Sequence, residues 1–393
     1  MTPETIAIVK SCVPILQEHG EALTRLFYQR MFTHNPEVKP FFNPIHQQEG
    51  TQQRALATAV LAYAQHIDNP AALSSAISLI ANKHASLMVK PEHYPIVGQN
   101  LLAALEELLG DAATPEILDA WGEAYGFLAE VFINAEKELY EQQEWNGFKD
   151  FTITKITQES SEVKSLHLKP VDPITFTHIP GQYITVRVPH PNTGTTMRNY
   201  SISSIPGDTL RISVKQESGD PDGWVSHQLH TLTQGDTLEV GPPCGDFTFT
   251  PNQHDSHPLV FVAGGIGITP LISMIHAAAK VQPSRPIHIV HAVRSNEARA
   301  FAADLQQLTK NNKNTTLHVF VENTSKADTR GENYHTQGRP SKEALAKLVP
   351  DNAEVYFCGP PEFMHVTTSA LDIAKIPAKR RHHEFFGPAQ GIS

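Results

Sequence analysis

The chain has 393 residues, of which 40% are hydrophobic and 18% are charged, so it can fill the cores of two or three domains and is too apolar to be disordered. Its formal charge of -10, without a basic tract, argues against a nucleic-acid partner. Three widely spaced cysteines without a C-x-x-C pair exclude a disulfide framework and a cysteine-based zinc site, which favours a cytoplasmic protein. We also expect a monomer with neither a signal peptide nor a transmembrane segment.

The chain contains three successive regions with different residue patterns. Residues 1–141 are expected to be helical, because Ala, Leu and Glu dominate and prolines fall at breaks. Residues 148–253 contain short runs of alternating apolar and polar residues bounded by Gly and Pro, which predicts a small antiparallel β-barrel. Residues 258–393 alternate apolar strands with helical stretches, the pattern of an α/β domain with a parallel sheet. The predicted fold class is therefore all-α, then antiparallel β, then α/β.

The helical part places an imidazole on an apolar helix face. Along this face the spacing is three or four residues, the repeat of one side of a helix, and the members are Leu73, Ile77, Ile80, His84 and Leu87. A buried ring nitrogen needs a partner. That partner is either a backbone carbonyl of the core or a metal such as haem iron.

Three more polar side chains fall on apolar helical stripes. They are Tyr28 in a helix expected over residues 21–32, Gln52 in a helix over 51–67, and Glu136 on a stripe that runs from Leu118 to Leu139. A carboxylate on such a stripe is costly unless it is paired. Each also has an ordinary explanation: a core tyrosine with its hydroxyl at the surface, a polar first-turn residue, and a glutamate that faces water.

The β-rich part carries a flavin signature. Arg198-Asn199-Tyr200-Ser201 follows a strand expected over residues 183–188 and matches the R-x-Y-S motif of ferredoxin-reductase-like flavoproteins. In that motif Arg198 would face the FAD pyrophosphate, Tyr200 the isoalloxazine and Ser201 flavin N5. The run Gly181-Gln182-Tyr183 strengthens the match. So does Gly223-Trp224-Val225-Ser226, which opens a helix whose N–H groups suit a pyrophosphate.

The α/β part carries a nucleotide loop and two shorter motifs. Gly264-Gly265-Ile266-Gly267-Ile268-Thr269-Pro270 follows a predicted strand and resembles the A-G-G-x-G-x-T-P form that the same reductases use at nucleotide phosphates. Cys358-Gly359-Pro360 ends a strand where these proteins place a C-G-P motif beside the nicotinamide, although Cys358 could be only a small strand-end residue. Glu384-Phe385-Phe386 resembles their terminal motif, in which Phe386 would cover the flavin.

Taken together, these features resemble the flavohaemoglobins of bacteria and yeast over the whole chain, and the runs Phe27-Tyr28, Lys83-His84 and Leu118-Asp119-Ala120-Trp121-Gly122 match them closely. The resemblance implies a b-type haem, FAD and NAD(P)H as cofactors. His84 would bind the iron, with a carboxylate pushing electron density toward it through the ring, which favours activation of O₂ over its storage. The other residues assigned to the haem site in this way are Tyr28, Gln52, Phe42, Leu56, Lys83, Tyr94 and Glu136.

The activity implied by the resemblance is that of a nitric oxide dioxygenase, in which NAD(P)H reduces FAD, FAD reduces the haem, and O₂ and NO give nitrate. Two other classes stay open: an O₂-binding or sensing protein, and a flavin-based reductase of haem or external acceptors for which the globin part is dispensable. Glu322, after a predicted strand, would repel a 2′-phosphate and favours NADH. Asp220-Pro221-Asp222 is an insertion relative to the family.

Overall fold

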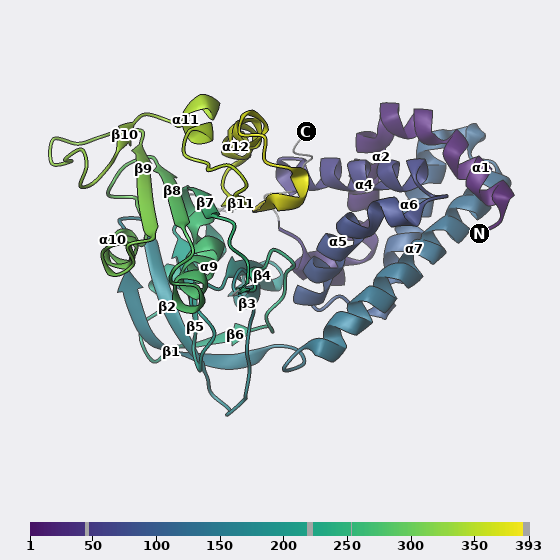
Figure 1. Cartoon of the computed structure of the whole chain (residues 1–393). Coiled ribbons are helices and arrows are strands. Elements are labelled where there is room, and N and C mark those ends of the chain that lie inside the picture. The colour runs from purple at the N-terminus through teal and green to yellow at the C-terminus, as the bar shows by residue number, and fades with distance from the viewer. Residues whose placement is uncertain (44–46, 218–222, 253, 388–393) are drawn as a thin grey trace. The chain divides into compact units, whose positions relative to one another are not determined.

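The computed structural model describes residues 1–43, 47–217, 223–252 and 254–387 (Figure 1). The chain separates into two compact units, one of Met1–Phe148 with Arg187–Arg198 and the other of Lys149–Val186 with Asn199–Ser393. The insertion at 220–222 lies outside the described residues. Among the helices that the structure describes, none combines the length and the apolar character needed to cross a membrane.

The first part of the chain is helical, which confirms the all-α prediction. Thr2 and Thr114 cap two of its helices through their side chains, and prolines stand in the first turn of several others, so the free N–H groups there are few. The helices are α1 (Pro3–Ser11), α2 (Val13–His34), α4 (Thr51–Gln65), α5 (Ser74–Ser86), α6 (Tyr94–Leu109) and α7 (Pro115–Gln142), joined by the short 3₁₀ turns η1 (Pro36–Phe41), η2 (Pro70–Leu73), η3 (Pro91–His93) and η4 (Gly110–Ala112).

The helices pack through the faces that the sequence pattern predicts. α2 lies against α4 and α6, and α5 lies against α7. Leu23, Phe27 and Met31, expected on one face of α2, are all buried. The helix expected over residues 51–67 ends at Gln65, because His66 leaves the helical conformation with φ at -112°. Ile67 is nevertheless part of the core.

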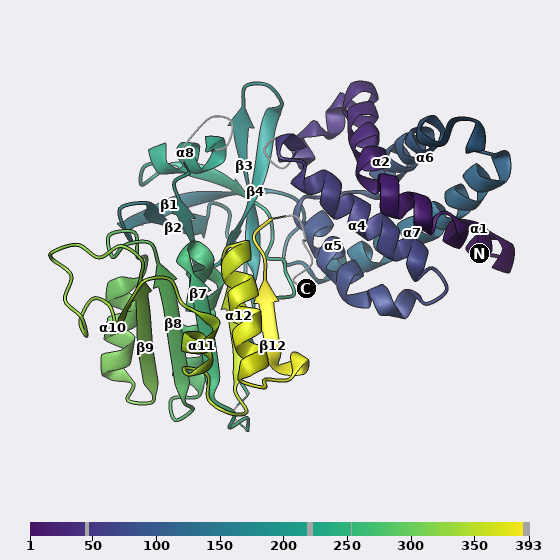
Figure 2. The same ribbon diagram turned by 90° about the horizontal axis from the view of Figure 1, so that it is seen from above.

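The antiparallel sheet has six strands in the order β4-β3-β6-β1-β2-β5, as expected for the β-rich part. An isolated bridge between Ile202, which follows β4, and Ile212 of β5 brings the two edge strands together, so the sheet closes into a barrel. The strands are β1 (Lys149–Gln158), β2 (Val163–Pro170), β3 (Tyr183–His190), β4 (Gly194–Ser201), β5 (Leu210–Lys215) and β6 (Thr237–Val240), and the helix α8 (Trp224–Thr231) follows β5 (Figure 2).

The last part forms a parallel sheet in the order β10-β9-β8-β7-β11-β12, which confirms the α/β prediction. The order reverses beside β7, so the carboxyl ends of β7 and β11 meet at a topological switch point, where ligands of such sheets bind. The strands are β7 (Leu259–Gly264), β8 (Ile287–Val293), β9 (Thr315–Val321), β10 (Thr336–Gln337), β11 (Glu354–Cys358) and β12 (Arg381–Glu384).

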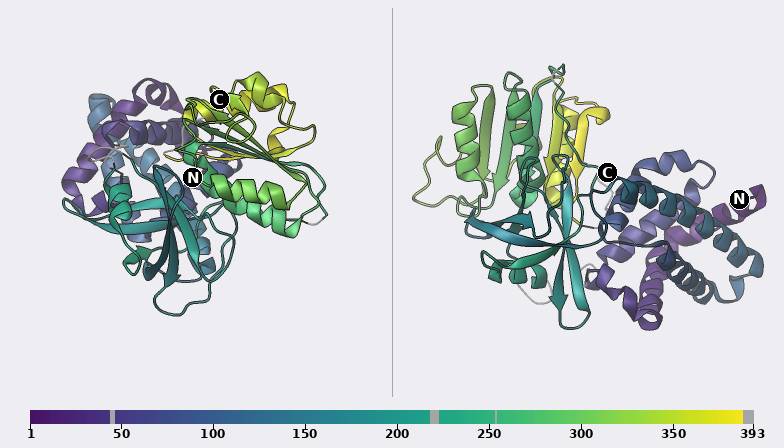
Figure 3. Two further views of the ribbon diagram at one scale, coloured as in Figure 1. Left: turned by 90° about the vertical axis from the view of Figure 1, so that its left-hand side faces the viewer. Right: turned by 90° about the horizontal axis from the view of Figure 1, so that it is seen from below.

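Helices cover both faces of this sheet (Figure 3). Residues that alternate along β7 separate into two cores: Leu259, Phe261 and Ala263 on one face, and Val260 and Val262 on the other. The first core receives α9 (Ile268–Val281) and α10 (Ala302–Asn311), and the second receives α11 (Lys342–Ala346) and α12 (Pro361–Ile373). A layer of helices on each face of the sheet thus buries the strands on both sides, as their continuous apolar sequences predict.

Candidate functional site

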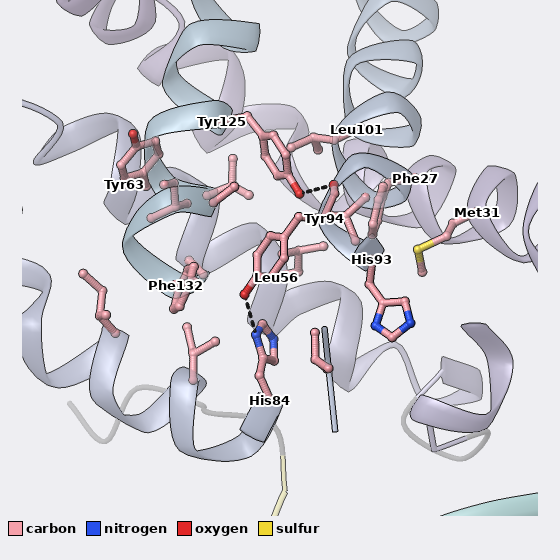
Figure 4. Close-up of a pocket in the computed structure, with 18 of the residues that line it drawn as sticks. Phe27, Met31, Leu56, Tyr63, His84, His93, Tyr94, Leu101, Tyr125 and Phe132 are labelled. Carbon is pink, nitrogen blue, oxygen red and sulfur yellow. Dashed lines mark hydrogen bonds between the residues drawn. The ribbon is translucent and has the colours of Figure 1, made fainter. Parts of the chain in front are cut away.

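The helices of the first unit enclose an apolar cavity of about 290 Å³ (Figure 4). Its walls come from α2, α4, α5, α6 and α7. Most of the side chains that line it are aromatic or aliphatic, among them Phe27, Met31, Phe42, Leu56, Val60, Ile77, Leu101 and Phe132. A cavity of this kind favours a large hydrophobic ligand held by a few polar groups.

His84 is the polar group at the base of this cavity in the close-up view (Figure 4). Its Nδ1 lies 2.8 Å from Oε1 of Glu136 and 3.2 Å from the hydroxyl of Tyr94. Tyr94 donates a hydrogen bond of 2.5 Å to the same carboxylate oxygen. Because the carboxylate accepts the Nδ1 proton, Nε2 keeps its lone pair for another partner.

Burial strengthens the electrostatic interactions among His84, Tyr94 and Glu136. Glu136 is only 1% exposed, which excludes the alternative that it faces water. Its second oxygen, Oε2, is also buried and has no hydrogen-bond partner among the described residues. Burial raises the pKa of Tyr94, and the hydrogen bond to Glu136 raises it further, so this phenol stays a neutral donor. The position of Tyr94 is held by a 2.6 Å hydrogen bond from the Tyr125 hydroxyl to its carbonyl.

Tyr28 is a second polar group of the cavity. Burial raises the pKa of its phenol, and a hydrogen bond with the Gln52 side chain opposes part of that shift. Its ring packs with Phe42, at 5.7 Å between centroids. Phe42 and Leu56 line the cavity. Gln52, in the first turn of α4, is connected to the cavity by its hydrogen bond with Tyr28. The structure therefore brings together the residues that the sequence pattern singled out one by one.

Two further polar side chains line the cavity: Trp121, which was expected only as part of an apolar stripe and a family-like run, and His93, which was not singled out from the sequence. The indole N–H of Trp121 is buried and has no hydrogen-bond partner among the described residues. His93 lies at the wall, where its Nδ1 accepts a hydrogen bond from the backbone N–H of Lys90. Lys83, which precedes His84 in α5, is half-buried. Because Trp121 lies on a long apolar stripe, the sequence pattern did not indicate a polar role for its N–H group.

These residues fit a haem. The cavity is apolar, and the Nε2 of His84 has a lone pair with no hydrogen bond in the part of the chain that the structure describes. A haem needs one such imidazole on its axis and hydrocarbon walls against the porphyrin. The hydrogen bonds at Nδ1 orient the ring and increase its basicity.

The flavin motifs lie on neighbouring strands of the barrel. The backbone N–H of Ile202 donates to the carbonyl of Gln182 at 2.8 Å, so the run that ends in Tyr183 lies beside Tyr200 and Ser201. The Arg198 guanidinium is half-buried on β4 and donates to the Met197 carbonyl at 2.7 Å. The ring of Tyr200, the hydroxyl of Ser201 and the guanidinium of Arg198 therefore come from the same stretch of chain at the end of β4.

Gly223 is the N-terminal cap of α8, and Val225 and Ser226 are buried in its first turn. The helix has no side-chain cap; instead, the Ser226 hydroxyl donates to the Gly223 carbonyl at 3.0 Å. The N-terminus of a helix suits an anionic ligand such as the pyrophosphate of FAD.

The nucleotide loop packs directly on the C-G-P motif at the switch point. A Cβ added at Gly267 would lie 2.3 Å from the Cys358 carbonyl oxygen, and one at Gly359 would lie 3.1 Å from Cα of Gly264. Only glycine permits this approach of two backbones. The loop then enters α9, where the Thr269 hydroxyl donates to the Ile266 carbonyl and Pro270 is buried. Gly265 adopts a positive φ of +54° in the turn.

Cys358 is a packed strand-end residue in this structure. Burial raises the pKa of its thiol well above the usual value, and the nearby Glu384 raises it further, so the thiol stays neutral. Glu384 is paired with Cys358 in the register of β11 and β12, which places the terminal motif beside the C-G-P motif. Phe386, in the same terminal motif, is 44% exposed.

His291 of β8 was missed by sequence reasoning. Its side chain is fully buried, and its Nε2 donates a 3.0 Å hydrogen bond to the carbonyl of Gly265 in the nucleotide loop. Burial lowers its pKa to about 4, so the ring is neutral. Its position inside a run of strand-forming residues offers no sign of this contact, which depends on the packing of β8 against β7.

Three parts of the chain match known families. Residues 25–132 match the globin family, 150–249 the oxidoreductase FAD-binding domain, and 261–369 the oxidoreductase NAD-binding domain. The chain is 44% identical to a flavohaemoprotein of Rhodopirellula baltica, with 100% of this chain and 99% of the relative covered. It is also 44% identical to a flavohaemoprotein of Bordetella pertussis, with 98% of each covered. The chain belongs to the flavohaemoprotein family.

Solved structures agree with this assignment. A flavohaemoglobin from Malassezia yamatoensis, solved with bound FAD and haem, has a TM-score of 0.86 at 29% identity and covers 98% of this chain and 99% of its own. The FAD- and NAD-binding part of a nitric oxide dioxygenase from Vibrio cholerae has a TM-score of 0.55 at 30% identity, with 62% of this chain and all of that one covered. This flavohaemoprotein is therefore an oxidoreductase with sites for haem, FAD and a nicotinamide nucleotide.

Proposed function

We propose that this flavohaemoprotein is a nitric oxide dioxygenase that uses NAD(P)H. The observation that carries the proposal is the buried carboxylate of Glu136, which accepts the Nδ1 proton of His84 beneath the apolar cavity. Haem and FAD, when bound, supply the redox chemistry by which O₂ and NO become nitrate at the expense of NAD(P)H. The similarity of the reductase half to the FAD- and NAD-binding part of the nitric oxide dioxygenase from Vibrio cholerae supports the same activity.

In the haem cavity, each polar residue has one role in this proposal. Glu136 and Tyr94 orient the His84 ring and make it a strong electron donor, which suits activation of O₂ more than its storage. Tyr28, kept neutral by burial, donates its O–H to a negatively charged ligand in the cavity, with Gln52 holding the phenol. Phe42, Leu56 and the other apolar walls exclude water, which strengthens these interactions.

In the reductase half, we propose a division into an FAD domain of residues 148–253 and an NAD(P) domain of residues 258–393, after a globin domain of residues 1–141. Arg198 and the N-terminus of α8 bind the FAD pyrophosphate. Tyr183, Tyr200 and Ser201 contact the flavin ring, which Phe386 covers. Gly264 to Pro270 bind the phosphates of the nicotinamide nucleotide, and Cys358, Gly359 and Pro360 shape the place of hydride transfer beside Glu384.

The test is aerobic NO consumption by the protein loaded with haem and FAD, followed with an NO electrode and by analysis of nitrate. We expect NADH-dependent loss of NO that requires O₂ and yields nitrate. Negligible NADH turnover in the presence of NO would favour an O₂-binding or sensing protein. Rapid NADH oxidation that NO does not alter would favour a flavin-based reductase instead.

A further inference from the structure

Two arginines follow the carboxyl ends of β8 and β10, which flank β9, on the edge of the parallel sheet where the nucleotide binds in the proposed function. Arg294 directly follows β8, the strand after the βαβ crossover that begins with the nucleotide loop. Arg339 follows β10. In nucleotide-binding folds, the residue at the end of that second strand contacts the ribose 2′ position, and an arginine nearby accommodates the 2′-phosphate of NADP. By residue type alone, Arg294 predicts a site for NADPH.

The structure shows that both arginines are already paired with carboxylates. Arg294 forms an ion pair with Glu162, from the turn between β1 and β2. The Nε of Arg339 lies 3.0 Å from Glu322 at the end of β9, and its Nη1 lies 3.4 Å from Glu362 in the first turn of α12. The Arg294 pair is electrically neutral, and the Arg339 group carries two negative charges and one positive charge. Neither group therefore offers an unpaired positive charge to a further dianionic group.

Backbone hydrogen bonds hold these pairs in place. The N–H of Ser161 donates to the Glu297 carbonyl at 2.8 Å, which ties the turn that carries Glu162 to the loop after β8. The N–H of Glu322 donates to the Val293 carbonyl at 3.0 Å, which ties the end of β9 to the end of β8. These bonds fix the main chain of both glutamates beside the end of β8, within side-chain reach of the arginines.

We propose that Glu162 and Glu322 are specificity-determining residues, which select NADH over NADPH by occupying the two cations that a 2′-phosphate would need. Glu322 therefore does not act alone in repelling the phosphate. It acts together with Glu162, and each of the two acts through an arginine. The proposed selection of NADH rests on the proposed nucleotide site but not on the reaction with NO. Both pairs are partly exposed, with side-chain exposure of 28% for Glu162 and 35% for Glu322, so their removal should not unfold the protein.

The experiment is calorimetric titration of the full chain, loaded with haem and FAD, with adenosine 2′,5′-bisphosphate and with 5′-AMP. In Glu162→Gln, the affinity for the bisphosphate relative to 5′-AMP should rise about fivefold, the size expected for one partly exposed charge pair. Glu322→Gln should act in the same direction and gives an independent result if Glu162→Gln folds poorly. Arg294→Ala in the Glu162→Gln background should cancel the gain.

The matched control is Asp351→Asn, which removes one exposed negative charge from the turn before β11, at the amino end of the sheet. An unchanged affinity ratio in both glutamine variants would overturn the proposal, and so would an equal rise in Asp351→Asn. If neither nucleotide binds to any variant, the nucleotide site is wrong as well. Normal NO consumption with an unchanged ratio would overturn this inference alone.

Discussion

In the proposed function, the carboxylate of Glu136 acts on the iron through the His84 ring, to which it is hydrogen-bonded, so its charge can be tested without altering the ligand. Glu136→Gln keeps the shape and an oxygen that accepts the Nδ1 proton, but it removes the negative charge. The imidazole then becomes a weaker donor to iron. We expect a lower iron–histidine stretching frequency in resonance Raman spectra of the ferrous protein and a higher haem reduction potential. Glu138→Gln, the same change at an exposed position of α7, is the control. An unmoved frequency in Glu136→Gln would make the carboxylate structural.

In the proposed function, Tyr28 acts on the bound ligand rather than on the metal. Tyr28→Phe removes the proposed donor from an apolar cavity, where a hydrogen bond to a charged acceptor contributes about 1.5–3 kcal/mol. We therefore expect O₂ to dissociate roughly tenfold faster or more, with slower NO consumption and normal flavin reduction. Tyr63→Phe is a matched control, because the Tyr63 hydroxyl also lies at the cavity wall but donates to the Ala124 carbonyl. Equal dissociation rates in the two variants would remove Tyr28 from the mechanism.

At the scale of elements, the nucleotide loop depends on β8 through the hydrogen bond from His291 to Gly265. Because burial lowers the pKa of His291 to about 4, below its usual value near 6.5, the unfolded ring binds a proton more readily than the folded one. Stability from this group is therefore complete above the unfolded pKa and is lost as the pH falls from about 6.5 toward 4. The loop should open more easily in acid.

The variant His291→Gln keeps a side-chain N–H donor but does not titrate. Between pH 7 and pH 5, the wild type should lose about 2 kcal/mol more of its opening free energy at residues 264–268 than this variant does. Hydrogen exchange, corrected for its intrinsic pH dependence, measures that energy. His254→Gln, at an exposed position, should keep the wild-type behaviour. The same pH dependence in all three proteins would show that His291 does not control the loop.

At the scale of the whole molecule, haem and FAD depend on different parts of one chain. Arg198→Ala removes a cation from the proposed pyrophosphate site, which a small side chain cannot replace. We expect a lower FAD content after dialysis and an unchanged haem content, measured from the absorption spectrum. Arg330→Ala, which removes an exposed guanidinium, should retain both cofactors. A variant of Arg198 that keeps its full flavin would refute the assignment of the R-x-Y-S motif.

Most of the fold could be predicted from local patterns. The period of the apolar residues distinguishes the helices of residues 1–141 from the alternating strands after Phe151, because that period depends only on the geometry of one element. Glycines that must fit a tight turn, such as Gly265, are likewise visible in the sequence. The helix end at Gln65 was misplaced because the departure of His66 from helical geometry leaves no periodic signal.

The sequence by itself thus determined the order of the three folds, the family and the residue types of its sites, since these follow from local periodicity and short motifs. Only the tertiary structure decided which distant residues meet. Glu136 reaches His84 from 52 residues away, and Glu162 reaches Arg294 from 132 residues away. Such pairs depend on how whole helices and strands pack. The packing energy is shared among many side chains whose positions in the sequence follow no regular spacing. For this reason candidate residues for the sites could be predicted from the sequence, while the pairing of the two arginines could not.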